Sequence, residues 1–249
     1  EKFVFKYYGK QQFEYLVTPG GFLTFTFPPS IRHDISIPFA EKHLIPVLQQ
    51  EADKTINNFL KGLSTDIYIK LKEVADYFTI GIDGKNPTNK QHIEFVAVFD
   101  LQQEKVIHWT GKFYPTEQQK KELIKINDLS CHFIKLNNQN VLILGCHDLN
   151  AYNPRGQATA SPDGWKKQVA DRFKRKCKEF DPDIVLQHPH STDTPNIWIA
   201  AWRELERELP KVKHFASGIN YSNKTGVRAS LDSVLQKTQK GDVINFYTD

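Results

Sequence analysis

The sequence VLILGCHDLN, residues 141–150, runs from aliphatic residues directly into three side chains that can do chemistry. Cys146 supplies a thiol, His147 an imidazole and Asp148 a carboxylate, all just past the expected end of a buried strand. In open α/β sheets, functional groups gather at the carboxyl ends of strands. The cluster therefore predicts a thiol nucleophile or a metal site. The alternative is a strand end followed by ordinary polar residues.

Lys112 has the same context, because it follows VIHWTG at the end of another expected strand. We expect the two strands to belong to one sheet and to present the thiol of Cys146 and the ammonium group at the same edge. A nearby lysine lowers the pKa of a thiol and makes it a better nucleophile at neutral pH. For a lone cysteine and a lone lysine, a core residue and a solvated charge would be the better interpretation. That interpretation is weaker here, because Cys146 and Lys112 both follow an expected strand.

A second chemically capable segment is LQHPHSTD, residues 186–193, which also follows an expected buried strand. His188 and His190 alternate on one side of an extended segment, and Asp193 follows. Together with the two polar residues after the cysteine, they offer nitrogen and oxygen ligands of the kind that zinc or manganese takes. Such a site would activate water for phosphoester hydrolysis.

The same segment allows a thiol–imidazole pair instead, with Cys146 beside His188 or His190, and with Asp193 orienting the ring. We rank the metal site below thiol chemistry, because histidine and aspartate are common in loops and because Asp193 also begins a good helix-start signal. Arg155, in the loop beyond the cysteine, is a candidate clamp for a carboxylate or phosphate, or else a partner for an acidic neighbour.

The hydrophobic pattern predicts the elements that must position these groups. Alternating or continuous apolar runs predict strands at 3–8, 13–17, 22–27, 78–82, 93–99, 106–109, 133–136, 141–144, 183–186, 212–219 and 243–247. Apolar residues at helical spacing predict helices at 39–61, from Thr65 or Asp66 onward, at 165–180, from Pro195 onward and at 228–238. Thr116 and Gln119 have the spacing of a capping box that opens a short lysine-rich helix.

The order of these elements predicts the α/β class, with helices outside a sheet. Residues 1–36 are predicted to form an N-terminal β extension, and residues 37–249 one main α/β domain. A chain of 249 residues, 39% of them hydrophobic, is long enough to bury a substantial core.

Composition and charge narrow the classes of protein further. The net charge of +4 permits an anionic ligand without requiring nucleic acid. The basic residues of 165–180 are explained as the solvent-exposed face of an amphipathic helix. No apolar run approaches the roughly 18 residues of a membrane span. The three cysteines cannot all pair, which favours free thiols and a reducing, cytoplasmic setting.

The segment GKFYPTEQQKKEL, residues 111–123, resembles the lysine segment of the nitrilase superfamily, the carbon–nitrogen hydrolases. Upstream, FVAVFDLQQEKVIHWTGK resembles the hairpin that delivers this lysine, and downstream VLILGCHD resembles the strand that ends in the nucleophilic cysteine. FDPDIVLQHP, WIAAWRELERELP and VKHFASGIN resemble the strand–helix–strand order that follows. The resemblance covers residues 65–225 and implies a nitrilase-like α-β-β-α sandwich.

The resemblance also implies a Glu-Lys-Cys triad that forms a covalent intermediate. Cys146 would attack the carbon of an amide or nitrile, Lys112 would stabilise the developing negative charge, and a glutamate would move the proton. Glu117 would match a second glutamate, which holds the lysine in place. The general-base glutamate should end an apolar strand well before the lysine. Glu41 is the nearest candidate by spacing, although its setting indicates a helix start.

The leading prediction is therefore a thiol-dependent hydrolase of a non-peptide carbon–nitrogen bond in a small molecule, without a cofactor or metal ion. Five side chains are predicted to bind the substrate: His147, Asp148, Arg155, His188 and His190. The alternatives are a metal-dependent phosphoesterase or nuclease, and a degenerate nitrilase-like module that binds without turnover. The resemblance implies a homodimer formed by helices after the nucleophile. Trp202 is a candidate contact, although Trp198 and Trp202 fit the core better. Nucleic-acid and membrane partners are not expected.

Overall fold

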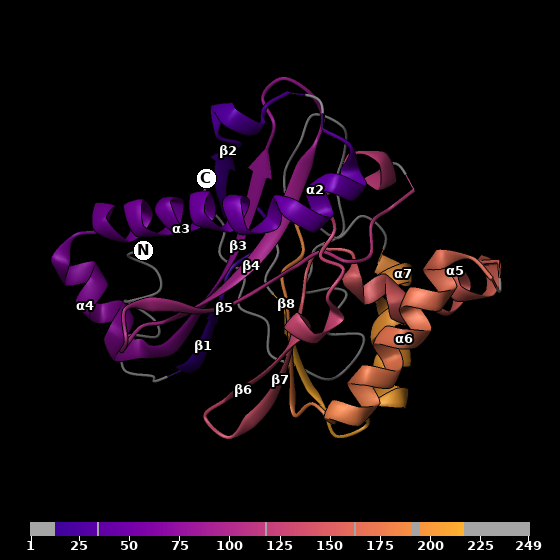
Figure 1. The fold of residues 1–249 in the computed structure, drawn as a ribbon. Helices are drawn as coiled ribbons and strands as arrows, with labels where there is room; N and C mark the ends of the chain where they lie inside the picture. Colours follow the sequence, from indigo (N-terminus) through magenta and orange to yellow (C-terminus); the bar gives the residue numbers. More distant parts are fainter. Residues whose placement is uncertain (1–12, 34, 118, 162, 191–194, 217–249) are drawn as a thin grey trace.

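The computed structural model describes residues 13–33, 35–117, 119–161, 163–190 and 195–216 (Figure 1). These residues form two β-sheets and six α-helices, so the prediction of the α/β class is confirmed. The expected strands at 3–8 and 243–247 and the expected helix at 228–238 lie outside the described residues.

The first sheet has five strands: β1 (Phe13–Val17), β2 (Leu23–Thr26), β3 (Ala75–Lys85), β4 (His92–Asp100) and β5 (Lys105–Gly111). β3, β4 and β5 form an antiparallel meander, whereas β1 and β2 both run parallel to β3. The described part of the N-terminal segment is thus hydrogen-bonded into the main sheet. The domain boundary at residue 36 stays a prediction.

The second sheet has the strand order β6-β7-β8-β9. A turn at Asn137 and Asn138, both with positive φ, joins β6 (Phe133–Leu136) to β7 (Gln139–Leu144), as a tight hairpin requires. β7, β8 (Ile184–Gln187) and β9 (Lys213–Ala216) are parallel, so each needs a crossover connection. α5 (Pro154–Thr159) and α6 (Trp165–Phe180) lie in the first crossover, and α7 (Pro195–Glu208) lies in the second.

The helix expected at 39–61 is two helices, α2 (Ile37–His43) and α3 (Ile45–Gly62). Pro46 stands in the first turn of α3, where its missing N–H leaves no hydrogen bond unmade. α4 (Thr65–Val74) is capped by Ser64, whose Oγ accepts the N–H of Ile67 at 3.4 Å, and not by Thr65 or Asp66. No helix in the described ranges has the length and apolar character needed to cross a bilayer.

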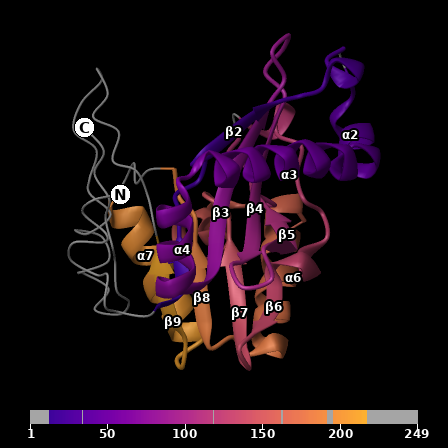
Figure 2. The same cartoon turned by 90° about the vertical axis from the view of Figure 1, so that its left-hand side faces the viewer.

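The elements pack in layers, with the two sheets between two sets of helices (Figure 1). In Figure 2, α3 and α4 lie in front of the first sheet. One face of the first sheet shares a core with α2, α3 and α4, in which Leu48 and Phe95 are buried. The other face meets the second sheet, where Val96 and Ile143 belong to one apolar cluster. The outer face of the second sheet packs against α6 and α7, and Trp202 is fully buried there, as the core interpretation predicts.

Alternation along the strands decides which side chains face the inter-sheet space. Val96 and Val98 of β4 belong to the inter-sheet cluster, while Ala97 between them belongs to the core shared with the helices. Glu94 continues the inter-sheet series by two residues. Asp83 lies directly opposite Glu94 on β3, so both carboxylates are on the same face. One end of an otherwise apolar layer therefore carries two charged side chains.

Gly81 of β3 lies where the chain after β1 passes over the sheet. A Cβ there would stand 2.3 Å from the carbonyl oxygen of Pro19 and 2.8 Å from the Cα of Gly20. Gly81→Ala is therefore expected to lower the free energy of unfolding by about 1–3 kcal/mol, measured by urea titration. Gly62→Ala is the matched control, because a Cβ at Gly62 meets nothing within 4 Å. Equal effects of the two changes would contradict the close approach.

Candidate active site

A cavity of about 450 Å³ lies where the carboxyl ends of β7 and β8 face the β3–β4 hairpin. Its inner wall includes Asp83, Glu94, Lys112, Cys146 and His190, and the loop between β3 and β4 forms its rim. The volume lies within the range of pockets that hold small molecules. The position agrees with the rule that functional groups collect beyond the carboxyl ends of parallel strands.

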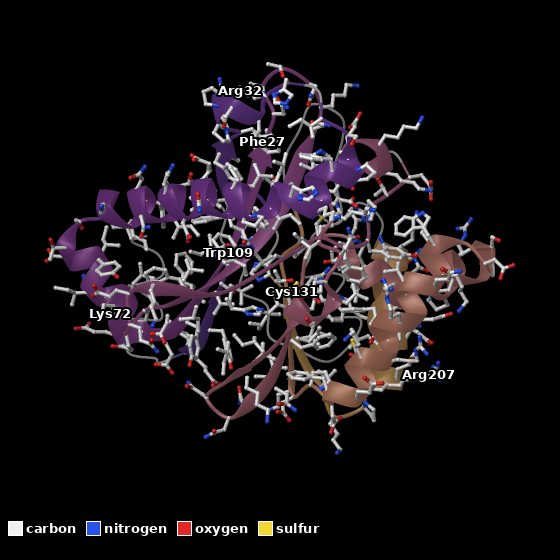
Figure 3. All side chains as sticks on the ribbon, in the orientation of Figure 1. Phe27, Arg32, Lys72, Trp109, Cys131 and Arg207 are labelled. Atoms are coloured by element: carbon white, nitrogen blue, oxygen red, sulfur yellow. The ribbon has the colours of Figure 1, made fainter. Side chains whose placement is uncertain are left out.

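Cys146 follows β7 and is 5% exposed. The backbone N–H of His190 donates a hydrogen bond to its Sγ over 3.2 Å. The other two thiols are differently placed, with Cys131 in a turn between the sheets (Figure 3) and Cys177 in α6. Burial raises the pKa of Cys131 to about 11 and that of Cys177 to about 12, and neither thiol lines the cavity. Cys146 is thus the thiol with access to a ligand.

Lys112 is almost fully buried, at 1% exposure, and its charge is held by two acceptors. Its Nζ donates to Glu94 Oε1 over 2.8 Å and to Gln119 Oε1 over 2.7 Å. Gln119 Nε2 donates in turn to Glu94 Oε1 over 3.1 Å. Burial raises the pKa of Glu94, but the nearby charges of Lys112 and His190 outweigh it, so the pKa lies below its usual value. The ammonium and carboxylate form a buried ion pair on the cavity wall.

Lys112 and Cys146 follow strands of different sheets, β5 and β7, which corrects the expectation of one shared sheet. They meet because the sheets face each other. Asp148 joins the two strand ends, since its carboxylate accepts N–H groups from Phe113, Tyr114 and Gly145 over 2.9–3.0 Å. Burial raises the pKa of Asp148 to about 7, while these donors lower it. Asp148 is fully buried and does not line the cavity, so it positions its neighbours.

His190 faces Cys146 from the end of β8. Its Nε2 donates to Asp83 Oδ2 over 2.9 Å, and its Nδ1 is 3.9 Å from Glu94 Oε2. Burial lowers the pKa of His190, but the hydrogen bond to Asp83 and the neighbouring thiol of Cys146 raise it to about 11. The imidazole therefore carries its proton between a carboxylate and a thiol.

Gly20 makes room for this imidazole. A Cβ at Gly20 would stand 2.8 Å from His190 Nδ1 and 2.7 Å from the carbonyl oxygen of His188. The backbone N–H of Gly20 also donates to the carbonyl oxygen of Pro189 over 3.1 Å, so the chain after β1 lies against the segment after β8. The lack of a side chain at Gly20 therefore leaves the space that the ring of His190 occupies.

Of the five predicted substrate-binding residues, His147 and His190 line the cavity, whereas Asp148, Arg155 and His188 do not. His188 is buried and its Nδ1 donates to the carbonyl oxygen of Thr18 over 2.7 Å, while burial lowers its pKa to about 4. His147 lines the cavity and its Nδ1 contacts the side-chain amide of Asn150 at 2.9 Å. Arg155 is exposed in α5 and does not line the cavity.

The two predicted glutamates lie elsewhere. Glu41 accepts the N–H of Lys125 over 3.3 Å and pairs with the same residue's ammonium at 3.0 Å. Glu117 has a side chain that is 70% exposed, and it pairs with Lys166 at 2.7 Å. The expectation that Glu117 holds Lys112 is therefore corrected, because Glu94 of β4 and Gln119 hold that ammonium group. Neither Glu41 nor Glu117 lines the cavity.

Sequence reasoning missed Asp83, Glu94 and Gln119. The signal for Glu94 was available, since IEFVAVF places a carboxylate in an apolar strand at the spacing of the inward-facing valines. A charge in such a position requires a partner. The capping box was predicted and is confirmed, with Gln119 N–H donating to Thr116 Oγ1 over 3.2 Å. The hydrogen bond between Gln119 and Lys112 could not be predicted from the spacing of the capping box.

The metal alternative required His147, Asp148 and the 188–193 segment to converge. Their side chains point to separate partners, and Asp193 lies outside the described residues. Within the described part of the chain, no three histidine, cysteine, aspartate or glutamate side chains are arranged to hold a metal ion. The geometry does not favour that alternative.

Comparison with known proteins gives distant structural likenesses. No family model matches the chain, and no curated protein matches it in sequence. An amidase from Nesterenkonia sp. AN1, whose active-site cysteine carries the product of Michael addition of acrylamide, matches 82% of this chain and 65% of its own, at 11% identity and a TM-score of 0.41. A glutamine-dependent NAD+ synthetase from Acinetobacter baumannii matches 78% of this chain and 35% of its own, at 15% identity and a TM-score of 0.38. The match thus spans less than two thirds of either protein.

Breaking the buried ion pair between Lys112 and Glu94 should lower the stability of the fold, whatever the protein's function. Lys112→Met leaves Glu94 buried without its cation, so the free energy of unfolding is expected to fall by about 3–5 kcal/mol. Glu117→Gln removes an exposed pair and is expected to change it by less than about 1 kcal/mol. Urea titration of both variants measures the difference. A larger loss from Glu117→Gln would show that the lysine is held as the sequence first indicated.

Proposed function

We propose that this protein hydrolyses a non-peptide carbon–nitrogen bond, and that Cys146 is the nucleophile. The observation that carries the proposal is the juxtaposition, in one cavity, of the Cys146 thiol with the imidazole of His190 and the ammonium of Lys112. The nitrilase-like resemblance of residues 65–225, with its α-β-β-α sandwich and its order of lysine and cysteine, supports the same reaction class.

His190 is the proton partner of the thiol in this proposal. The raised pKa of His190 keeps the imidazole protonated beside the sulfur. The thiolate, and not the thiol, is the attacking form of a cysteine. Asp83 orients the ring through Nε2 and leaves Nδ1 toward Cys146 and Glu94. This arrangement supplies the acid and base that the resemblance would assign to a glutamate after an earlier strand.

Lys112 supplies electrostatic stabilisation. A fixed and almost fully buried ammonium stabilises negative charge that develops on the carbonyl oxygen during attack. Glu94 and Gln119 hold the ammonium group in place, so that little reorganisation accompanies the reaction. Lys112 is thus a stabiliser of the transition state, and the two acceptors are positioning residues.

Two buried carboxylate oxygens favour an amide over a nitrile. Asp83 Oδ1 and Glu94 Oε2 have no hydrogen-bond donor among the described residues, although both side chains line the cavity. A buried acceptor without a donor is costly. Both oxygens are enclosed, so a rotation of each side chain must first bring them to the cavity surface. The N–H groups of a primary amide would then satisfy these acceptors, whereas a nitrile has no donor to offer.

Hydrolysis of an amide would take place in two stages, through a thioester on Cys146. The sulfur of Cys146 bonds to the carbonyl carbon, and the imidazolium of His190 gives its proton to the nitrogen as the carbon–nitrogen bond breaks. Ammonia or an amine leaves a thioester on Cys146. The neutral imidazole then takes a proton from water, and the oxygen of that water bonds to the carbonyl carbon. The carbon–sulfur bond breaks, a carboxylic acid is released, and the thiolate–imidazolium pair is restored.

Intact-mass spectrometry with a panel of primary amides and nitriles tests the proposal. We expect ammonia release together with a transient mass increase equal to the acyl group, located on Cys146 by peptide mapping. The matched control is Cys131→Ser, which should keep both signals. A protein that binds members of the panel without adduct or ammonia would instead be a binding module. The role of His147, the homodimer and the cytoplasmic setting stay predictions.

A further inference from the structure

The loop between β3 and β4, which forms the cavity rim, is built by its own amide side chains. Asn86 Oδ1 accepts the N–H of Thr88 over 3.1 Å, and Asn89 Oδ1 accepts the N–H of Gln91 over 2.8 Å. Gln91 Nε2 donates to the carbonyl oxygen of Ile35. Because these groups are engaged within the protein, the loop presents its lysines from a fixed frame.

The charges that line the cavity do not cancel. On the inner wall Asp83 is paired with His190, and Glu94 is paired with Lys112, so two negative charges meet two positive ones. On the rim, Lys85 and Lys90 line the same cavity and are exposed. No carboxylate of the described residues lies within 4.0 Å of either rim ammonium. The cavity therefore has an excess of two positive charges, both on its rim.

We propose that Lys85 and Lys90 bind an anionic group of the substrate, at the end away from the bond that is cleaved. This inference rests on the proposed function and assigns a substrate class to it: a primary amide that carries a carboxylate. Lys85 is two residues beyond Asp83 on the same face of β3, about 7 Å along the strand. The carboxylate and the amide are thus separated by a short carbon chain, as in the monoamide of a dicarboxylic acid.

The first test compares amides of similar length and different charge. Glutaramate, pentanamide and 5-aminopentanamide carry a negative, a neutral and a positive end. We expect kcat/KM to be highest for glutaramate, by about 10-fold or more over pentanamide, and lowest for the cationic amide. Lys85→Gln and Lys90→Gln should each reduce the glutaramate-to-pentanamide ratio about 10-fold. Lys61→Gln, an exposed lysine of α3 outside the cavity, should leave the ratio unchanged. Equal kcat/KM for the three amides would overturn the anion site while leaving hydrolysis intact.

The second test measures binding without turnover, so that the two proposals fail separately. Calorimetric titration of Cys146→Ala with glutaramate should give binding that weakens with added salt. It should also weaken about 10-fold in the double variants Cys146→Ala/Lys85→Gln and Cys146→Ala/Lys90→Gln. Such binding without hydrolysis by the wild type would keep the anion site and reject the enzymatic proposal. Pentanamide binding as tightly as glutaramate would reject the anion site.

Discussion

Replacing Cys146 with alanine is expected to abolish amide hydrolysis, with kcat reduced by at least about 10³-fold, because the sulfur forms the covalent bond in the reaction. The fold should persist, since the Cys146 side chain lies at a cavity wall rather than inside an apolar cluster. Ammonia release from a primary amide measures the activity, and circular dichroism confirms that the variant is folded.

Cys131→Ser is the matched control for this change. Cys131 is also a free thiol, and burial raises its pKa to about 11, so it is not a competing nucleophile at neutral pH. Activity close to that of the wild type is expected in this variant. Full activity in Cys146→Ala, or an equal loss in Cys131→Ser, would contradict the assignment of the nucleophile.

The second large effect is expected at His190. His190→Gln removes the group that gives and takes the proton, so kcat should fall by about 10²–10⁴-fold. Asp83→Asn should lower the rate less, and it should also change the pH profile, because Asp83 holds the His190 proton. With Asp83 in place the pKa of His190 is raised to about 11, so the alkaline limb of kcat/KM lies far above neutral. In Asp83→Asn, the alkaline limb of the kcat/KM profile should move toward the ordinary histidine pKa, near 6.5.

The same shift has a consequence for folding. Because the pKa of His190 is raised on folding, its contribution to stability is fully present below about pH 6.5 and is lost as the pH rises toward 11. Asp83→Asn should weaken this dependence, since only the contribution of Cys146 to the raised pKa would remain. An NMR titration of the His190 ring in both proteins measures the pKa directly. An unchanged pKa in Asp83→Asn would show that Asp83 does not orient a catalytic imidazole.

Gly20→Ala tests the position of the His190 imidazole without replacing a titratable residue. The added methyl group would meet the His190 ring and the carbonyl oxygen of His188 at less than 3 Å. We expect the ring to be displaced and kcat to fall, while Gly62→Ala leaves activity unchanged. Full activity in Gly20→Ala would show that the close approach has no bearing on the reaction.

Most strands could be predicted because their apolar residues alternate or run together. β1 and β6 begin and end where the pattern placed them. The parallel pairing of β1 and β2 with β3 was not predictable, since β1 and β3 are separated by three helices and leave no local signal of contact. The arrangement in two sheets was expected only from the resemblance, because the strand pattern alone does not show which strands share a sheet. Lys112 and Cys146 were expected at the same edge of one sheet. They line one cavity, but from facing sheets.

The acid–base partners could be predicted only in part. His190 was a candidate because it follows a buried strand, whereas its partner Asp83 comes from a strand distant in sequence. Glu117 was expected to hold the lysine because the resemblance implies a second glutamate at this place in the sequence. In the folded chain, the turn opened by Thr116 directs Gln119 toward the lysine and leaves Glu117 in solvent. Such choices depend on backbone direction within a turn, which spacing does not reveal.

The most direct test of an activated nucleophile is the rate at which iodoacetamide alkylates each cysteine as a function of pH, resolved by peptide mass spectrometry. We predict that Cys146 reacts at neutral pH far faster than Cys131 and Cys177, whose pKa values burial raises to about 11 and 12. The rate at Cys146 should fall in Lys112→Met and in His190→Gln. Equal rates for the three thiols, or a Cys146 rate that is indifferent to both substitutions, would contradict the account.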